Sequence, residues 1–187
     1  MIYVYQGEIW VTEAGRAHPT YARISESPEF EGKKLAKALT FCYYVYTKVD
    51  LVSGKKNFYW QMPPMERKQR VDNDFKLYKG KFDDLESKED YVNFRDFYQS
   101  LMLSDNDRNY ETFRAKSEYW RSQLALMDNK PKDELEIAKA LQNSSELADE
   151  YKVKSDLETL DKNQKGMGLY MFEVPEDMKP HDMKLNL

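Results

Sequence analysis

Cysteine and histidine are scarce in this 187-residue sequence, which holds one cysteine and two histidines. With Cys42 alone, no disulfide can form within the chain, and this usage is typical of proteins made in a reducing compartment. A zinc site would need a fourth ligand besides Cys42, His18 and His181, and the two histidines lie near opposite ends of the sequence. We therefore expect no metal site and no cofactor.

Glycine and proline are also few, with seven of each, and there is no long apolar run. This composition argues against a collagen-like chain or one made mostly of linkers. No stretch approaches the roughly 20 apolar residues of a membrane-spanning helix. The first residues, MIYVYQGEIW, lack the basic start of a signal peptide. We expect a protein made in the cytoplasm, with no membrane contact.

Charge of one sign does not dominate either, because 29 basic and 33 acidic residues give a net charge of −4 and are mixed along the chain. Nucleic-acid binders usually concentrate Lys and Arg on one face, so we expect no direct contact with nucleic acid. What the sequence does contain is 41% hydrophobic and 14% aromatic residues. These are enough for a core, although tyrosine and tryptophan also favour interfaces.

Apolar residues recur at helical spacing through most of the sequence, and this predicts a mainly α fold. Residues 32–49 are apolar nearly all round, which is typical of a buried central helix. Further helices are predicted from Pro64 to Tyr78 and over 87–103, where Ser87 to Asp90 resemble a capping box.

The cleanest helical pattern lies in residues 108–127, after Asp105-Asn106-Asp107, which we expect to cap this helix. Its stripe alternates steps of three and four and consists of Tyr110, Phe113, Ser117, Trp120, Leu124 and Met127. Such a seam predicts that this helix and the helix over 87–103 form an antiparallel αα-hairpin. Residues 132–163 contain no glycine or proline, but their apolar face is thin and interrupted. A helix of this kind gains stability from a partner or remains solvated.

The two ends of the chain lack helical periodicity. The alternation at Ile2 and Val4, and again at Ile9 and Val11, favours short β pieces in an extended arm or an edge hairpin. We therefore predict three parts, which are an N-terminal extended arm (1–31), a helical bundle or αα-hairpin body (32–165) and a C-terminal extended tail (166–187).

Patterns that could carry chemistry are weak. Asp105-x-Asp107-x-Asn109 resembles the opening of a calcium loop, but Tyr110 stands where that loop needs glycine. Cys42 is expected to be a buried thiol. The basic cluster Arg67-Lys68-x-Arg70 is flanked by acids, which favours salt bridges over phosphate contacts. We expect no catalytic residue, although an acid pair such as Asp83-Asp84 leaves an enzyme as a distant alternative.

Aromatic residues in three segments are the candidate partner contacts, with core packing as the alternative for each. They are Tyr3, Tyr5 and Trp10 near the start, Phe58, Tyr59 and Trp60 in the middle, and Tyr170, Met171 and Phe172 near the end.

Two segments carry a resemblance to a known group of proteins. These are Ala38 to Thr47, ALTFCYYVYT, and the later pattern Pro63-Pro64-x-Glu66-Arg67-Lys68-x-x-Val71. They resemble a pattern in small virion proteins of large tailed bacteriophages, including crAss-like phages, where an aromatic helix leads to a Pro-x-x-Glu-Arg-Lys helix. The resemblance implies a structural role near the portal vertex or neck and provides no catalytic residues. The connection from Val49 to Met62 lacks the Ser-Pro-Tyr-like tripeptide of that pattern.

The sequence thus predicts a non-enzymatic viral structural protein, located in the virion and present in multiple copies. Its expected partners are other virion proteins of the portal, capsid or neck, contacted through the arms. The alternative is a small regulatory or inhibitory module that binds a host protein through Phe58-Tyr59-Trp60 or through the thin face of 132–163.

Overall fold

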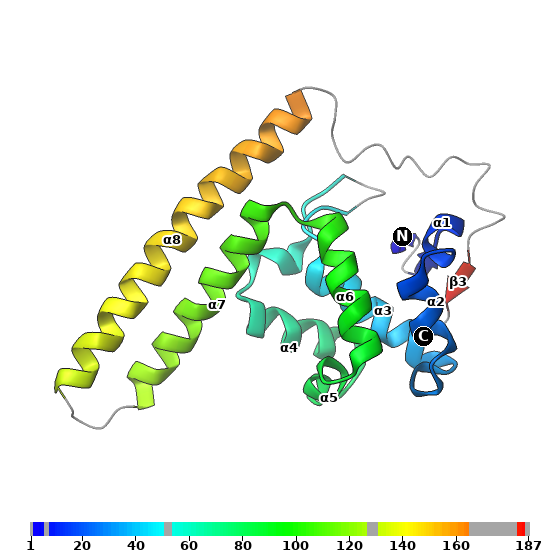
Figure 1. The fold of residues 1–187 in the computed structure, drawn as a ribbon, viewed down its shortest axis with the longest axis horizontal. Helices are drawn as coiled ribbons and strands as arrows, with labels where there is room; N and C mark the ends of the chain where they lie inside the picture. The colour runs from blue at the N-terminus through cyan, green and yellow to red at the C-terminus, as the bar shows by residue number, and fades with distance from the viewer. Residues whose placement is uncertain (1, 6–7, 51–53, 127–130, 165–182, 186–187) are drawn as a thin grey trace. The chain divides into compact units, whose positions relative to one another are not determined.

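The computed structural model describes residues 2–5, 8–50, 54–126, 131–164 and 183–185, with only the backbone described at a few element ends (Figure 1). The predicted mainly α class is confirmed, and the helices are accompanied by a short antiparallel sheet near the N-terminus. The chain divides into two compact units. Unit 1 consists of residues 1–62, 66–102 and 169–187, and unit 2 of residues 63–65 and 103–168.

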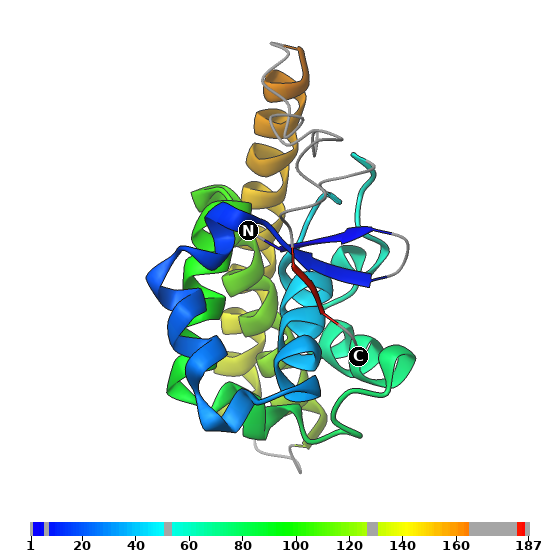
Figure 2. The ribbon, with the colours of Figure 1, turned by 90° about the vertical axis from the view of Figure 1, so that its right-hand side faces the viewer.

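The sheet has three strands, β1 (Ile2–Tyr5), β2 (Glu8–Val11) and β3 (Met183–Leu185), in the order β1-β2-β3. Both pairs are antiparallel, and Figure 2 shows β3 beside the N-terminal hairpin. Ile9 and Val11 are buried because alternate side chains of a strand point to one face. The expected edge hairpin is therefore present, and part of the expected C-terminal tail is a strand rather than an extension.

Residues 13–30 correct the prediction of an extended arm over 1–31, because they are helical. They form α1 (Glu13–Arg16), α2 (Pro19–Glu26) and the 3-10 turn η1 (Pro28–Phe30). The Oγ1 atom of Thr12 accepts from the amide of Gly15 at 3.0 Å, and Pro19 stands in the first turn of α2. Thr12 and Pro19 thus begin helices, as capping residues and N-terminal prolines do. Buried apolar side chains then fix this segment in unit 1.

The helix α3 (Lys33–Tyr46) is the central element of unit 1, as residues 32–49 predicted. Nine of its 14 residues are buried, and Figure 2 shows it beside the sheet. Cys42 is fully buried here, and burial raises the pKa of its thiol well above the usual value. The expectation of a structural thiol is confirmed.

The rest of unit 1 follows α3 in the order η2 (Phe58–Gln61), α4 (Pro64–Phe75), α5 (Phe82–Glu86) and α6 (Glu89–Met102). The prediction of a capping box at Ser87 was wrong. The Ser87 hydroxyl donates to the carbonyl of Asp84 at 2.9 Å, because Ser87 ends α5, a five-residue helix that periodicity did not reveal.

Unit 2 is built on α7 (Asp105–Leu126) and α8 (Pro131–Gln164), which lie side by side as an antiparallel hairpin in Figure 1. The prediction of an αα-hairpin between 87–103 and 108–127 was wrong in its partner, because 108–127 pairs with 132–163 instead. The expected single helical body over 32–165 divides between two units. The reason is that α7 and α8 pack mainly on each other. In the part of the chain that the structure describes, no helix is long and apolar enough to cross a membrane.

Candidate protein-binding site

The seam between α7 and α8 is built from small side chains and stacked rings. Ser117, Ser144, Ala148 and Ser155 are buried in unit 2. Farther along, the rings of Phe113 and Tyr151 stack with their centroids 5.6 Å apart. Small residues allow two helix axes to approach closely, so this seam excludes water without a large apolar stripe.

A polar network closes one end of the seam. The amide and hydroxyl of Ser104 both donate to the Asp107 carboxylate, at 3.1 and 3.0 Å, and the Asp107 amide donates to the Ser104 hydroxyl at 3.2 Å. This reciprocal arrangement is a capping box, and it starts α7 three residues earlier than predicted. The Ser155 hydroxyl donates to the other oxygen of the same carboxylate. Because Asp107 is only 6% exposed, this network fixes the register of the two helices.

The outer face of α8 carries apolar side chains that no other described residue buries. Val153, Leu157 and Leu160 are 59%, 59% and 56% exposed. Their spacing of four and three residues places them on one face, and at about 100° per residue Leu157 points about 180° away from the buried Ala148. These three residues are the outer stripe of α8.

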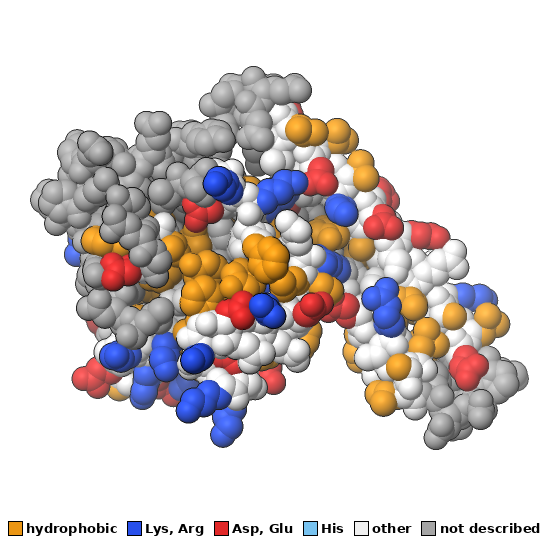
Figure 3. All heavy atoms as spheres, turned by 180° about the vertical axis from the view of Figure 1, so that it is seen from behind, with side chains coloured by type: hydrophobic (Ala, Val, Ile, Leu, Met, Phe, Trp, Pro, Cys, Tyr) orange, Lys and Arg blue, Asp and Glu red, His pale blue; other side chains and the backbone are white. Residues whose placement is uncertain are grey.

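A further exposed apolar residue, Leu135, lies on the same face of α8, nearer the hairpin turn. Leu135 is 58% exposed and stands 18 residues before Val153, which is five full helical turns or about 27 Å. On α7, Tyr119 and Leu126 are also exposed, at 54% and 78%. Figure 3 shows apolar side chains at the surface of the hairpin among charged ones. A helix that leaves such residues in water is typical of one that packs on a partner.

The apolar face of 132–163 looked thin and interrupted in the sequence because it joins two different faces of α8. Leu141 and Ala148 face α7, whereas Leu135 and Leu160 do not. Two stripes on opposite faces of a 34-residue helix look like one thin stripe when no partner helix is specified. The spacing of Val153, Leu157 and Leu160 was the signal that could have separated them.

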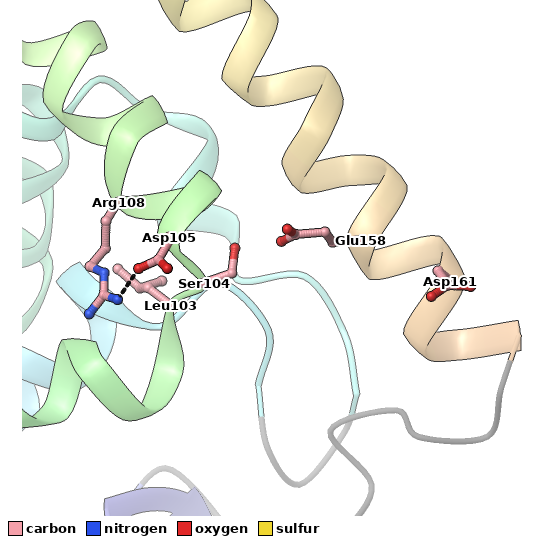
Figure 4. A pocket seen from close by; sticks show the side chains of 6 residues that line it. All are labelled: Leu103, Ser104, Asp105, Arg108, Glu158 and Asp161. Atoms are coloured by element: carbon pink, nitrogen blue, oxygen red, sulfur yellow. Dashed lines mark hydrogen bonds and ion pairs between the residues drawn. The ribbon is translucent and has the colours of Figure 1, made fainter.

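A hollow of about 430 Å³ lies at the base of the hairpin (Figure 4). It is lined from α7 and the residues before it by Leu103, Ser104, Asp105 and Arg108, and from α8 by Glu158 and Asp161. The polar groups are engaged locally, since Arg108 is paired with Asp105 and the Asn106 amide donates to Glu158. Among the described residues, no group of His, Cys, Asp and Glu is placed to hold a metal ion. The Ser104 hydroxyl is likewise engaged, because it donates to the Asp107 carboxylate within the capping box.

The N-terminal contact candidates lie in the sheet. Tyr3 is 4% exposed and its ring stacks on Trp10 with centroids 6.5 Å apart. Tyr3 is therefore a core residue rather than a free contact, because cross-strand pairing at Tyr3–Trp10 encloses the ring. Trp10 is half-buried. Tyr5 lies in β1, and its side chain falls outside the described residues.

Of the three central candidates, only Phe58 is presented to solvent, at 61% exposed. Trp60 is 8% exposed and lies under the Arg67 guanidinium, 4.3 Å from the ring centroid. Tyr59 packs on Tyr44 and donates its hydroxyl to Asp74 at 3.0 Å. For Tyr59 and Trp60 the core-packing alternative holds, since the 3-10 turn directs both rings onto neighbouring helices. Tyr170, Met171 and Phe172 lie outside the described residues.

The basic cluster is resolved into structural contacts. The Lys68 ammonium meets Glu86 at 2.6 Å and the Arg70 guanidinium meets Asp74 at 3.0 Å, so these two form the expected salt bridges. Arg67 differs, because it is 1% exposed and donates to backbone carbonyls.

Comparison with known proteins gave no match, whether to protein-family models, curated proteins or solved structures. Functional inference therefore depends on the residues themselves.

Proposed function

We propose that this chain is a non-enzymatic structural protein of a tailed-phage virion, and that the outer stripe of α8 is its principal contact with a neighbouring virion protein. The observation that carries the proposal is the exposure of Val153, Leu157 and Leu160 at spacings of four and three residues. Such a stripe is half of a helix-packing seam, and it fits an amphipathic helix or an apolar groove on the partner.

The distance between Leu135 and the outer stripe also favours an extended partner over a small one. Leu135 and the outer stripe are separated by polar residues at Lys139, Gln142 and Glu146. A partner that contacts both must follow α8 for about 27 Å, as a portal or neck subunit with a long helix would. The resemblance of residues 38–47 and 63–71 to small phage virion proteins supports the same role. Multiple copies around a ring would each present one hairpin.

Replacing apolar residues of the stripe by charged ones tests the proposal. The double variant Leu157→Glu/Leu160→Glu places two charges in the contact, and we expect incorporation into particles to fall at least about tenfold. The matched control is Lys152→Glu, an exposed position of α8 away from the stripe, which changes the charge by the same two units. Incorporation is measured by mass spectrometry of purified particles, and circular dichroism checks that both variants are helical.

Two outcomes would contradict the proposal. Absence of the chain from purified particles, together with a stable one-to-one complex with a host protein, would assign the regulatory alternative instead. Equal incorporation of both variants would show that the outer stripe is not part of the contact.

A further inference from the structure

Unit 1 contains a separate hollow of about 330 Å³, formed where the start of α3, the loop 76–81 and the α5–α6 junction meet. Its lining combines an apolar floor with charged walls. The floor is Phe30, Leu77, Tyr78 and Leu85, and the walls are Lys34, Lys37, Lys81 and Lys88 with Glu29 and Asp84. Figure 3 shows basic side chains gathered on one part of the surface of unit 1.

The floor of this hollow is an edge of the hydrophobic core. Phe30, Leu77 and Leu85 are 3%, 5% and 2% exposed, so the core packing holds them in place. The ring of Tyr78 is fixed by an edge-to-face contact with Phe41, with centroids 5.8 Å apart. A ligand entering here meets mainly the partly exposed ring of Tyr78, which the buried residues behind it hold in place.

The lysines of the walls outnumber the acids. Lys88 pairs with Glu29 at 3.0 Å, and the Lys37 ammonium donates to the carbonyl of Leu77 at 3.4 Å. Within the described part of the chain, Lys34 and Lys81 make no ion pair. Four lysines against two acids leave a formal charge of +2 around the hollow. A chain with a net charge of −4 thus keeps a local positive site.

The loop beside the hollow is held in a conformation that its lysines do not favour. Lys76 and Lys79 have φ angles of 52° and 55°, in the left-handed region where glycine and asparagine are usual. The buried Asp72 carboxylate accepts from the amides of Tyr78 and Gly80, and this holds the loop. Strained backbone of this kind gathers at ligand sites, where the surrounding structure enforces it.

We propose that this hollow binds a small phosphate-bearing molecule whose other part is flat and apolar, of the size of a mononucleotide. Its volume is at the lower end of the range of small-molecule sites, which begins at about 300 Å³. Lysine ammonium groups are compact point charges that neutralise a phosphate of charge about −2 from several directions. The partly exposed ring of Tyr78 gives the flat part a surface for contact.

Calorimetric titration of the full chain with AMP tests this site. The variant Lys34→Gln/Lys81→Gln removes the two wall lysines without ion pairs, and the matched control Lys139→Gln/Lys152→Gln removes two exposed lysines of α8. We expect the first variant to weaken the Kd for AMP about tenfold or more, because each lost charge-assisted contact is strong. The control variant is expected to change the Kd less than about twofold, because α8 contributes no residue to the hollow. Inorganic phosphate is expected to bind the wild-type chain more weakly than AMP does.

Four results would overturn the proposal. They are no heat of binding with AMP at about 1 mM, an equal loss in both variants, inorganic phosphate binding as tightly as AMP, and tighter binding of a short single-stranded oligonucleotide that is lost in the Lys34→Gln/Lys81→Gln variant. The last result would assign the surface to nucleic acid.

Discussion

At the scale of single residues, Arg67 is the most constrained side chain of unit 1. It is 1% exposed, and its guanidinium donates to the carbonyls of Val45 at 2.9 Å, Tyr59 at 3.1 Å, Trp60 at 3.3 Å and Met62 at 3.1 Å. One side chain thus satisfies the backbone at the end of α3 and through η2, where no regular ladder is available. The sequence showed Arg67 only as a member of a basic cluster, because burial of a charge is invisible without the fold.

Arg67→Met is expected to destabilise unit 1 by about 3 kcal/mol or more, because it leaves buried carbonyls without donors. The control Arg70→Met removes an ion pair between consecutive helical turns whose arginine side chain is 58% exposed, and should cost about 0.5 kcal/mol or less. Urea unfolding followed by circular dichroism measures both. Similar losses in the two variants would contradict the structural role of Arg67.

At the scale of elements, the sequence predicted what depends on local periodicity and missed what depends on distant partners. The helices α3, α4, α6, α7 and α8 were all expected from apolar spacing, and they are present. The strand β3 was not, because three residues gain strand structure only through pairing with β2. The helices of 13–26 were missed because short helices are held by caps and by burial rather than by propensity. The outer stripe of α8 could not be recognised from the sequence, because that requires knowing which face of α8 is covered by α7.

The seam of the hairpin gives a prediction at this scale. Ala148→Glu buries a carboxylate between α7 and α8, and we expect a loss of about 2–4 kcal/mol in hairpin stability. The control Asn143→Glu adds the same group at an exposed position of α8. Limited proteolysis within 103–164 should be accelerated only in the seam variant. Unchanged resistance would mean that the two helices do not depend on this contact.

At the scale of the whole molecule, tyrosine is the dominant buried titratable group. In the described part of the chain, burial raises the pKa of eight tyrosines, and that of Tyr59 rises to about 12 through burial and its hydrogen bond to Asp74. The eight are Tyr21, Tyr43, Tyr44, Tyr46, Tyr59, Tyr78, Tyr91 and Tyr98.

The raised pKa values predict alkaline unfolding. Above pH 10 the unfolded chain releases phenolic protons that the folded chain keeps, so stability is complete below pH 10 and falls as the pH rises through 12 and beyond. Absorbance at 295 nm, recorded with circular dichroism, should show part of the tyrosinate appearing only as helix is lost. In concentrated guanidinium all tyrosines should titrate near pH 10. Complete ionisation near pH 10 in a fully helical protein would contradict this prediction.

The pairing of β2 with β3 also dictates the order in which the protein can be completed as it leaves the ribosome. Val11 pairs with Met183, so about 170 residues are synthesised between the two partners. At roughly 5–20 residues per second, the N-terminal hairpin waits about 10 to 30 s for its third strand. The residues of the α7–α8 hairpin are synthesised within that interval, because 105–164 lie between the two partner strands. The sheet of unit 1 is therefore begun before the hairpin is made and is completed only after it.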